Sequence, residues 1–88
     1  MLIEEKQQEE DVIVSFNKAM GSKIAERHNR YRPMGWSTMD LKRLLKLLKG
    51  EIEELEGAIK EKDSEHIKDE SIDVANYCMF IWHKQNEQ

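Results

Sequence analysis

Apolar residues recur at helical spacing in the first third of the chain. Ile13, Phe16, Met20 and Ile24 follow one another at intervals of three or four residues, which places them on one face of a helix. This pattern predicts a helix over about residues 8–31.

A heptad-like seam occupies the middle of the chain. Its apolar residues step alternately by four and by three: Leu41, Leu45, Leu48, Ile52, Leu55 and Ile59. We expect Ser37 or Thr38 to cap the start of this helix, with Asp40 adding a negative charge in the first turn. The helix should then run to about residues 60–62.

A third helix is expected over about residues 65–86, with Asp63 or Ser64 as its cap. Residues 74–82 are apolar on nearly every side, which is typical of a helix buried on more than one face. A chain of 88 residues has difficulty covering such a helix by itself. Because no stretch alternates with a period of two, the pattern predicts an all-α fold. We expect an antiparallel bundle of three main helices, with a core completed by homo-oligomerisation.

Composition narrows the class of protein. Charged residues make up 36% of the chain and apolar residues 39%, which is too apolar for a disordered chain and too charged for a membrane protein. The length allows a single domain, residues 1–88, with residues 1–7 expected as a frayed tail. The acidic first dozen residues are either such a tail or an interface strip. The start shows no signal-peptide pattern, and the single cysteine, Cys78, excludes an internal disulfide. We therefore expect a cytoplasmic protein that does not associate with membranes.

The charge is unevenly distributed. Residues 1–17 carry a net charge of −4, residues 18–49 carry +7 and residues 50–88 carry −7. Basic clusters attract phosphates and acidic clusters attract metal cations. The acidic half would repel a nucleic-acid backbone, so no stable nucleic-acid binding is expected.

Four acids lie on helix faces that otherwise look buried. Glu51 and Glu54 are three residues apart, as are Glu70 and Asp73, and side chains at this spacing share a face. At about 100° per residue, the first pair falls within or at the edge of an apolar arc, and the second pair lies among large apolar groups. Such acids are costly unless they are paired or bound to metal. Four carboxylates offer oxygen ligands that suit Mg²⁺ or Mn²⁺. The alternative is that each acid pairs with a Lys or Arg at the edge of the apolar face.

The two acidic segments together resemble a known family. Residues 51–55 (Glu-Ile-Glu-Glu-Leu) and 70–77 (Glu-Ser-Ile-Asp-Val-Ala-Asn-Tyr) are similar to the paired ExxE and ExxD motifs of the MazG-like nucleoside triphosphate pyrophosphohydrolases, of the all-α NTP pyrophosphatase superfamily. The fifteen residues between Glu54 and Glu70, the Gly35-Trp36 loop and the Leu-rich approach to the first motif also fit. The resemblance covers roughly residues 23–84.

The resemblance implies an all-α homodimer or dimer of dimers that converts a (d)NTP to a (d)NMP and pyrophosphate with Mg²⁺, in house-cleaning or control of the nucleotide pool. The positions that match the family's metal ligands are Glu51, Glu54, Glu70 and Asp73. Many members begin the first motif with two adjacent glutamates, whereas this chain has Gly50 before Glu51. One of Glu51 and Glu54 is expected to orient or deprotonate the attacking water, and the spacing does not decide between them. Base and sugar preference stay open.

Basic, aromatic and amide side chains complete the candidate site. In an antiparallel helix pair, Arg43 and Lys84 lie towards one end of the site, where they can contact phosphates or serve as ordinary surface bases. Arg30 precedes the loop and is a further phosphate candidate. Trp36 either stacks on a nucleobase or anchors the loop on the core. Asn76, which matches the family motif, is a candidate for a substrate hydrogen bond.

A non-catalytic reading of the same sequence uses the heptad-like seam. A helical adaptor would associate with its partner through that seam, would show no dependence on divalent metal and would tolerate Glu51→Gln.

Overall fold

A computed structural model describes residues 2–30 and 35–87, and of residues 2, 3, 28–30 and 87 only the backbone. Its three α-helices are α1 (Leu2–Arg30), α2 (Leu41–Glu61) and α3 (Ser64–Lys84). Two short 3₁₀ turns, η1 (Trp36–Thr38) and η2 (Gln85–Glu87), precede α2 and follow α3. The described residues contain no β-strand, so the prediction of an all-α fold is confirmed.

The first helix begins at Leu2 rather than near residue 8. The first turn contains Glu4 and Glu5, whose negative charges interact favourably with the N-terminal end of the helix dipole. The acidic, Gln-rich and Lys-containing start has good helix propensity but lacks the apolar periodicity on which the predicted boundary rested.

Aspartates cap the other two helices. Asp40 accepts a hydrogen bond of 2.8 Å from the backbone N–H of Arg43, so the prediction that Ser37 or Thr38 caps α2 is wrong. The Thr38 hydroxyl instead donates to the Gly35 carbonyl within η1. Asp63, one of the two predicted caps of α3, accepts a hydrogen bond from the backbone N–H of His66.

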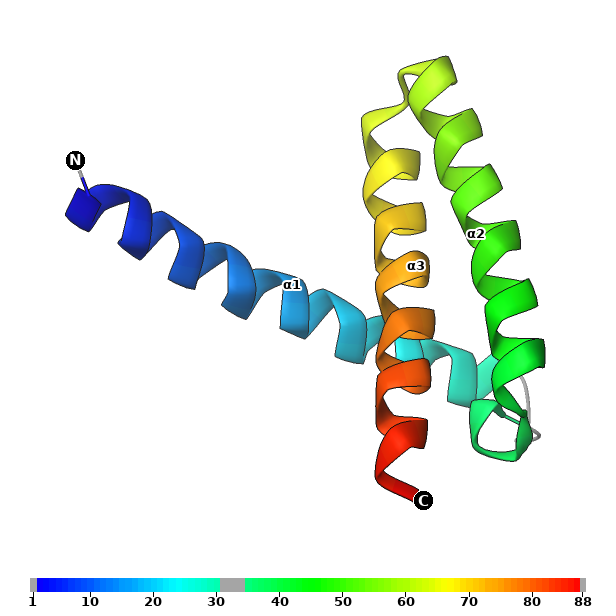
Figure 1. Cartoon of the computed structure of the whole chain (residues 1–88). Helices are drawn as coiled ribbons and strands as arrows, with labels where there is room; N and C mark the ends of the chain where they lie inside the picture. The colour runs from blue at the N-terminus through cyan, green and yellow to red at the C-terminus, as the bar shows by residue number, and fades with distance from the viewer. Residues whose placement is uncertain (1, 31–34, 88) are drawn as a thin grey trace.

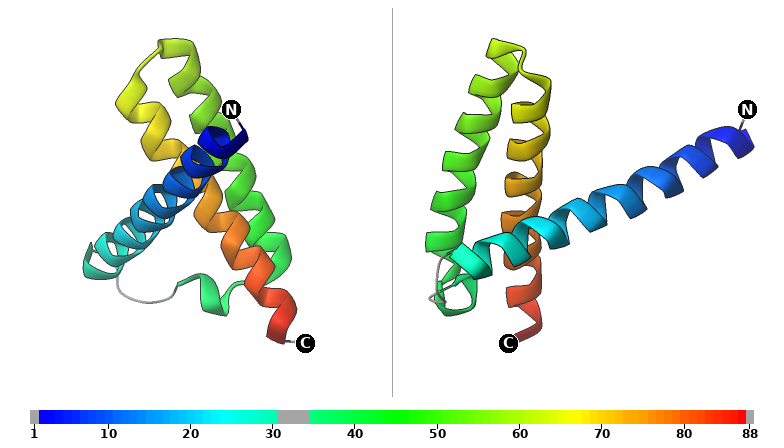
Figure 2. Two further views of the ribbon diagram at one scale, coloured as in Figure 1. Left: turned by 90° about the vertical axis from the view of Figure 1, so that its left-hand side faces the viewer. Right: turned by 180° about the vertical axis from the view of Figure 1, so that it is seen from behind.

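Helices α2 and α3 lie side by side and antiparallel, whereas α1 crosses them (Figure 1). The N-terminal half of α1 projects away from this hairpin, as Figure 1 and the right-hand view of Figure 2 show. The predicted antiparallel packing therefore applies to two of the three helices.

The core is small and lies near the C-terminal end of α3. Leu44, Tyr77 and Phe80 are buried together, and Trp36 of η1 stacks on the Phe80 ring with 4.6 Å between ring centroids. Most of the heptad-like seam faces away from this core, since Leu41, Leu45, Ile52 and Ile59 are between 39% and 54% exposed. The face of α2 that packs inward is the one that also carries Glu51.

Candidate metal centre

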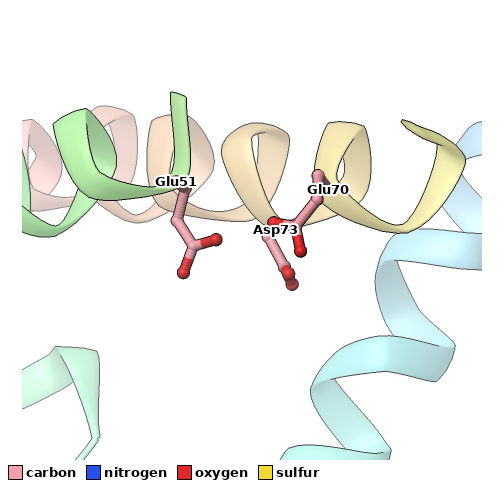
Figure 3. A group of neighbouring side chains, drawn as sticks. All are labelled: Glu51, Glu70 and Asp73. Atoms are coloured by element: carbon pink, nitrogen blue, oxygen red, sulfur yellow. The ribbon is translucent and has the colours of Figure 1, made fainter. Parts of the chain in front are cut away.

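Three carboxylates from two helices meet beside the hairpin. Glu51 comes from α2, and Glu70 and Asp73 come from α3. One oxygen of each lies within 4.8 Å of an oxygen of the others. Figure 3 shows the three side chains pointing to the same side of the hairpin. Glu70 and Asp73 are buried, so the prediction that these acids lie on inward faces is confirmed.

Glu54, the fourth predicted acid, is exposed and lies outside this group of three, so the prediction that it lies on an inward face is wrong. It is nevertheless close enough to interact with the Glu70 carboxyl. Three of the four acids therefore converge, and Glu54 borders the cluster that they form.

Each of the three acids has a buried oxygen without a hydrogen bond. Oε2 of Glu51, Oε2 of Glu70 and Oδ1 of Asp73 are buried and accept no hydrogen bond. A buried polar atom without a partner costs free energy of about 1–3 kcal/mol, and more when it is charged. Three unsatisfied carboxylate oxygens on one side of a hairpin are the donor set that a hard divalent cation prefers.

Crowding of like charges changes how these acids titrate. Burial, the charge of Asp73 and a hydrogen bond with Glu70 raise the pKa of Glu51 to about 7. Burial also raises the pKa of Glu70, with a further contribution from the neighbouring Glu54. Without a cation, Glu51 therefore keeps its proton to a higher pH than an ordinary glutamate does.

Comparison with known proteins bears on what such a cluster is for. Residues 13–86 match the sequence model of the phosphoribosyl-ATP pyrophosphohydrolase family. The chain belongs to this family. The family is part of the all-α NTP pyrophosphatase superfamily, which includes the MazG-like enzymes, so the family resemblance of the two acidic motifs is confirmed.

A second comparison finds a relative that is itself uncharacterised. A protein of Archaeoglobus fulgidus is 38% identical over 71 residues, which cover 78% of this chain and 76% of the relative. No solved structure matches the chain significantly. The family acts on phosphoric anhydrides, a chemistry in which carboxylate-held metal ions are common.

Lys23 and His66 contact the acids of this pyrophosphohydrolase-family chain. No sequence pattern had indicated either residue. The Lys23 ammonium, from α1, hydrogen-bonds Asp69 and lies 3.3 Å from Oδ1 of Asp73. His66 Nε2 lies 3.2 Å from Oε1 of Glu70, one helical turn away. A signal for His66 was available in its i, i+4 spacing to Glu70. Nothing local marks Lys23, because its partners are 46 and 50 residues further along the chain.

Asn76 is buried one turn beyond Asp73. Its amide nitrogen donates to the Met20 carbonyl at 3.4 Å, so it joins α3 to α1. Its carbonyl oxygen is buried without a partner. That oxygen is the part of Asn76 left for the predicted substrate hydrogen bond.

Two of the four remaining candidates, Trp36 and Lys84, contact the loop and the core. Trp36 stacks on Phe80 and meets the edge of His83, which favours the loop-anchor reading. Lys84 donates to the Ser37 carbonyl at 2.8 Å, which ties the end of α3 to η1. Arg43 is exposed at the start of α2, and the Arg30 side chain lies outside the described part of the chain.

Gly50 departs from the paired glutamates of many related sequences, and it is exposed on α2. A Cβ built at this position would meet nothing within 4 Å. The backbone therefore does not require a glycine there, and the missing carboxylate is a difference of chemistry, not of space.

Glu51 gives the metal-free protein a stability that falls as pH rises. Its pKa is about 7 in the folded state and about 4.3 in an unfolded chain, so the stabilisation is complete below about pH 4 and is lost through pH 7. In EDTA, we expect the free energy of unfolding to drop by about 1–2 kcal/mol from pH 5 to 8 after solvent screening. Urea denaturation at several pH values measures this, and Glu51→Gln should flatten the profile. An equally steep profile in that variant would contradict the assignment.

Proposed function

We propose that this chain is a Mg²⁺-dependent pyrophosphohydrolase that cleaves the α–β anhydride of a nucleoside triphosphate and releases a nucleoside monophosphate and pyrophosphate. The observation that carries the proposal is the group of three clustered carboxylates with unsatisfied buried oxygens. Such acids reduce the stability of a metal-free fold, so an adaptor would gain nothing from them. Removal of unwanted nucleotides or control of their concentration is the role in which we place this activity.

The residues divide into two tasks. Glu51, Glu70 and Asp73 would hold the cation, which when bound neutralises phosphate charge and acidifies water. Mn²⁺ offers the same oxygen preference and is the expected substitute. Glu54, which borders the cluster without belonging to it, is left to orient the attacking water and accept its proton.

Two kinds of molecule carry the triphosphate ester that the proposed reaction needs. One is an ordinary (d)NTP, and the other is phosphoribosyl-ATP, after which the matching family is named. Both would present the same anhydride to the acids, so the site chemistry does not distinguish them.

Pyrophosphate release from a panel of substrates tests the proposal. The panel contains the canonical and modified NTPs and dNTPs and phosphoribosyl-ATP, each with Mg²⁺, with Mn²⁺ and with EDTA. We expect pyrophosphate and monophosphate in equal amounts from at least one substrate, and none in EDTA. Release of orthophosphate, or no product from any substrate at micromolar protein, would reject the mechanism.

We also propose that the chain works as a homodimer or a dimer of dimers. Large apolar side chains are exposed on two helices: Val12, Ile13, Val14 and Phe16 on α1, and Leu41, Leu45, Ile52 and Ile59 on α2. The start of α1 is acidic and the first half of α2 is basic, so the two surfaces are complementary in charge as well as apolar. A second copy would cover both.

The α2 surface offers a direct test of assembly. Leu45→Glu combined with Ile52→Glu places charges in the proposed interface, and we expect a monomer by light scattering at a concentration where the wild type is larger. Lys60→Glu changes the net charge equally at an exposed position in the second half of α2 and should leave the assembly intact. A wild-type monomer at 100 μM, or an unchanged mass for the double Glu variant, would contradict the proposal.

No helix among residues 2–30 and 35–87 combines the length and the apolar character needed to cross a membrane.

A further inference from the structure

Lys23 is the cationic side chain that α1 brings to the acidic cluster. The three acids belong to the α2–α3 hairpin, whereas Lys23 belongs to the helix that crosses it. Its ammonium contacts Asp69 and Asp73 together, and its side chain is 24% exposed. A Lys in this position carries a charge opposite to the cluster, from a separate element.

The contacts of Lys23 with Asp69 and with Asp73 differ in geometry. Asp69 is 58% exposed and hydrogen-bonds the ammonium. Asp73 lies 3.3 Å away, yet its Oδ1 is without a well-formed hydrogen bond. Asp69 therefore fixes the ammonium at the edge of the cluster, and the interaction with Asp73 is mainly one of charge.

Charge balance indicates what the ammonium does when a substrate is present. Three or four carboxylates and a triphosphate together carry far more negative charge than one divalent cation neutralises, so further positive charge is needed beside the phosphates. Two other basic side chains have contacts elsewhere: Arg27 lies over the Tyr77 ring, and Lys84 donates to the Ser37 carbonyl.

We propose that Lys23 is a substrate-positioning residue. While the site holds no cation, its ammonium neutralises the charge of Asp73. With Asp73 coordinating a metal ion, the ammonium would contact a phosphate oxygen of the substrate. Asp69 keeps the ammonium in place in both states. This inference rests on the proposed function, because it assumes that the cluster binds a divalent cation and a phosphate chain.

Two binding measurements on Lys23→Met test the inference. Removing a neighbouring positive charge should strengthen Mg²⁺ binding about threefold to tenfold in calorimetric titrations. With Mg²⁺ saturating, removing one charge-assisted hydrogen bond should weaken inorganic pyrophosphate binding about tenfold to a hundredfold. Lys23→Arg keeps the charge and should remain within about threefold of wild type in both.

Opposite changes in the two affinities distinguish this role from a structural one. A Lys that only held α1 against α3 would weaken both ligands on removal, and that outcome would overturn the inference, as would unchanged affinities. Lys18→Met removes an exposed charge from the same helix and should change neither affinity. If the wild type binds no Mg²⁺, both the proposed function and this inference fail. If Lys23→Met does not fold, Lys23→Gln takes its place with the same expectations.

Discussion

Replacing Glu70 by Gln should lower pyrophosphate release by about a thousandfold, equivalent to about 4 kcal/mol of transition-state stabilisation. Glu70 is only 7% exposed, and its Oε2 is one of the unsatisfied buried oxygens. The amide keeps the shape of the side chain but loses the charge that would hold a cation. Steady-state assays with saturating Mg²⁺ measure the loss.

The same change should raise the stability of the metal-free protein. Burial and the nearby Glu54 already raise the pKa of Glu70, which means that its ionised form is disfavoured in the folded state. In EDTA, Glu70→Gln should therefore melt at a higher temperature than wild type, and Mg²⁺ should stabilise only the wild type. Glu53→Gln, an exposed change on α2, is the control for both measurements. Near-normal turnover in Glu70→Gln would remove Glu70 from the proposed site.

Truncating Phe80 to Ala should unfold a large fraction of the protein. Phe80 is 1% exposed, stacks on Trp36 and meets the Tyr77 ring edge at 5.7 Å between centroids. Loss of a buried Phe side chain costs about 3–5 kcal/mol, whereas a domain of this size has about 4–13 kcal/mol in total.

Urea denaturation followed by circular dichroism measures this cost. Phe80→Leu fills part of the space and should cost clearly less than Phe80→Ala. Cys78→Ala, at an exposed position of the same helix, should change the free energy of unfolding by about 0.5 kcal/mol or less. A loss below about 1 kcal/mol for Phe80→Ala would show that the Trp36 stack does not organise the core.

The helices and the inward acids could be predicted because both depend on local periodicity. Glu51, Glu70 and Asp73 share faces with large apolar residues, and the turn at Asp63 makes α2 and α3 neighbours. From these two facts the convergence follows. The cap of α2 was misplaced because Asp40, which was expected only to add charge in the first turn, follows Ser37 and Thr38 closely and can cap equally well. Only the loop conformation selects among the three.

The partners of the acids could not be predicted in the same way. Lys23 reaches Asp73 because α1 crosses α3 at that level, and a single Lys on a charged helix carries no pattern that specifies the crossing. Trp36 had two interpretations of similar weight, and the position of Phe80 beneath the loop favours one of them. The packing of elements far apart in the sequence decides which polar side chains pair with one another.

The arrangement of the acids also has a consequence for the order of folding. Glu51, Glu70 and Asp73 all lie within one helical hairpin, whose contacts are local and therefore quick to form. We expect the negative charges to come together at this early stage, before α1 docks and brings the Lys23 ammonium to them. A divalent cation captured by the hairpin would then accelerate folding, and not merely slow unfolding, since it would already be bound in the transition state.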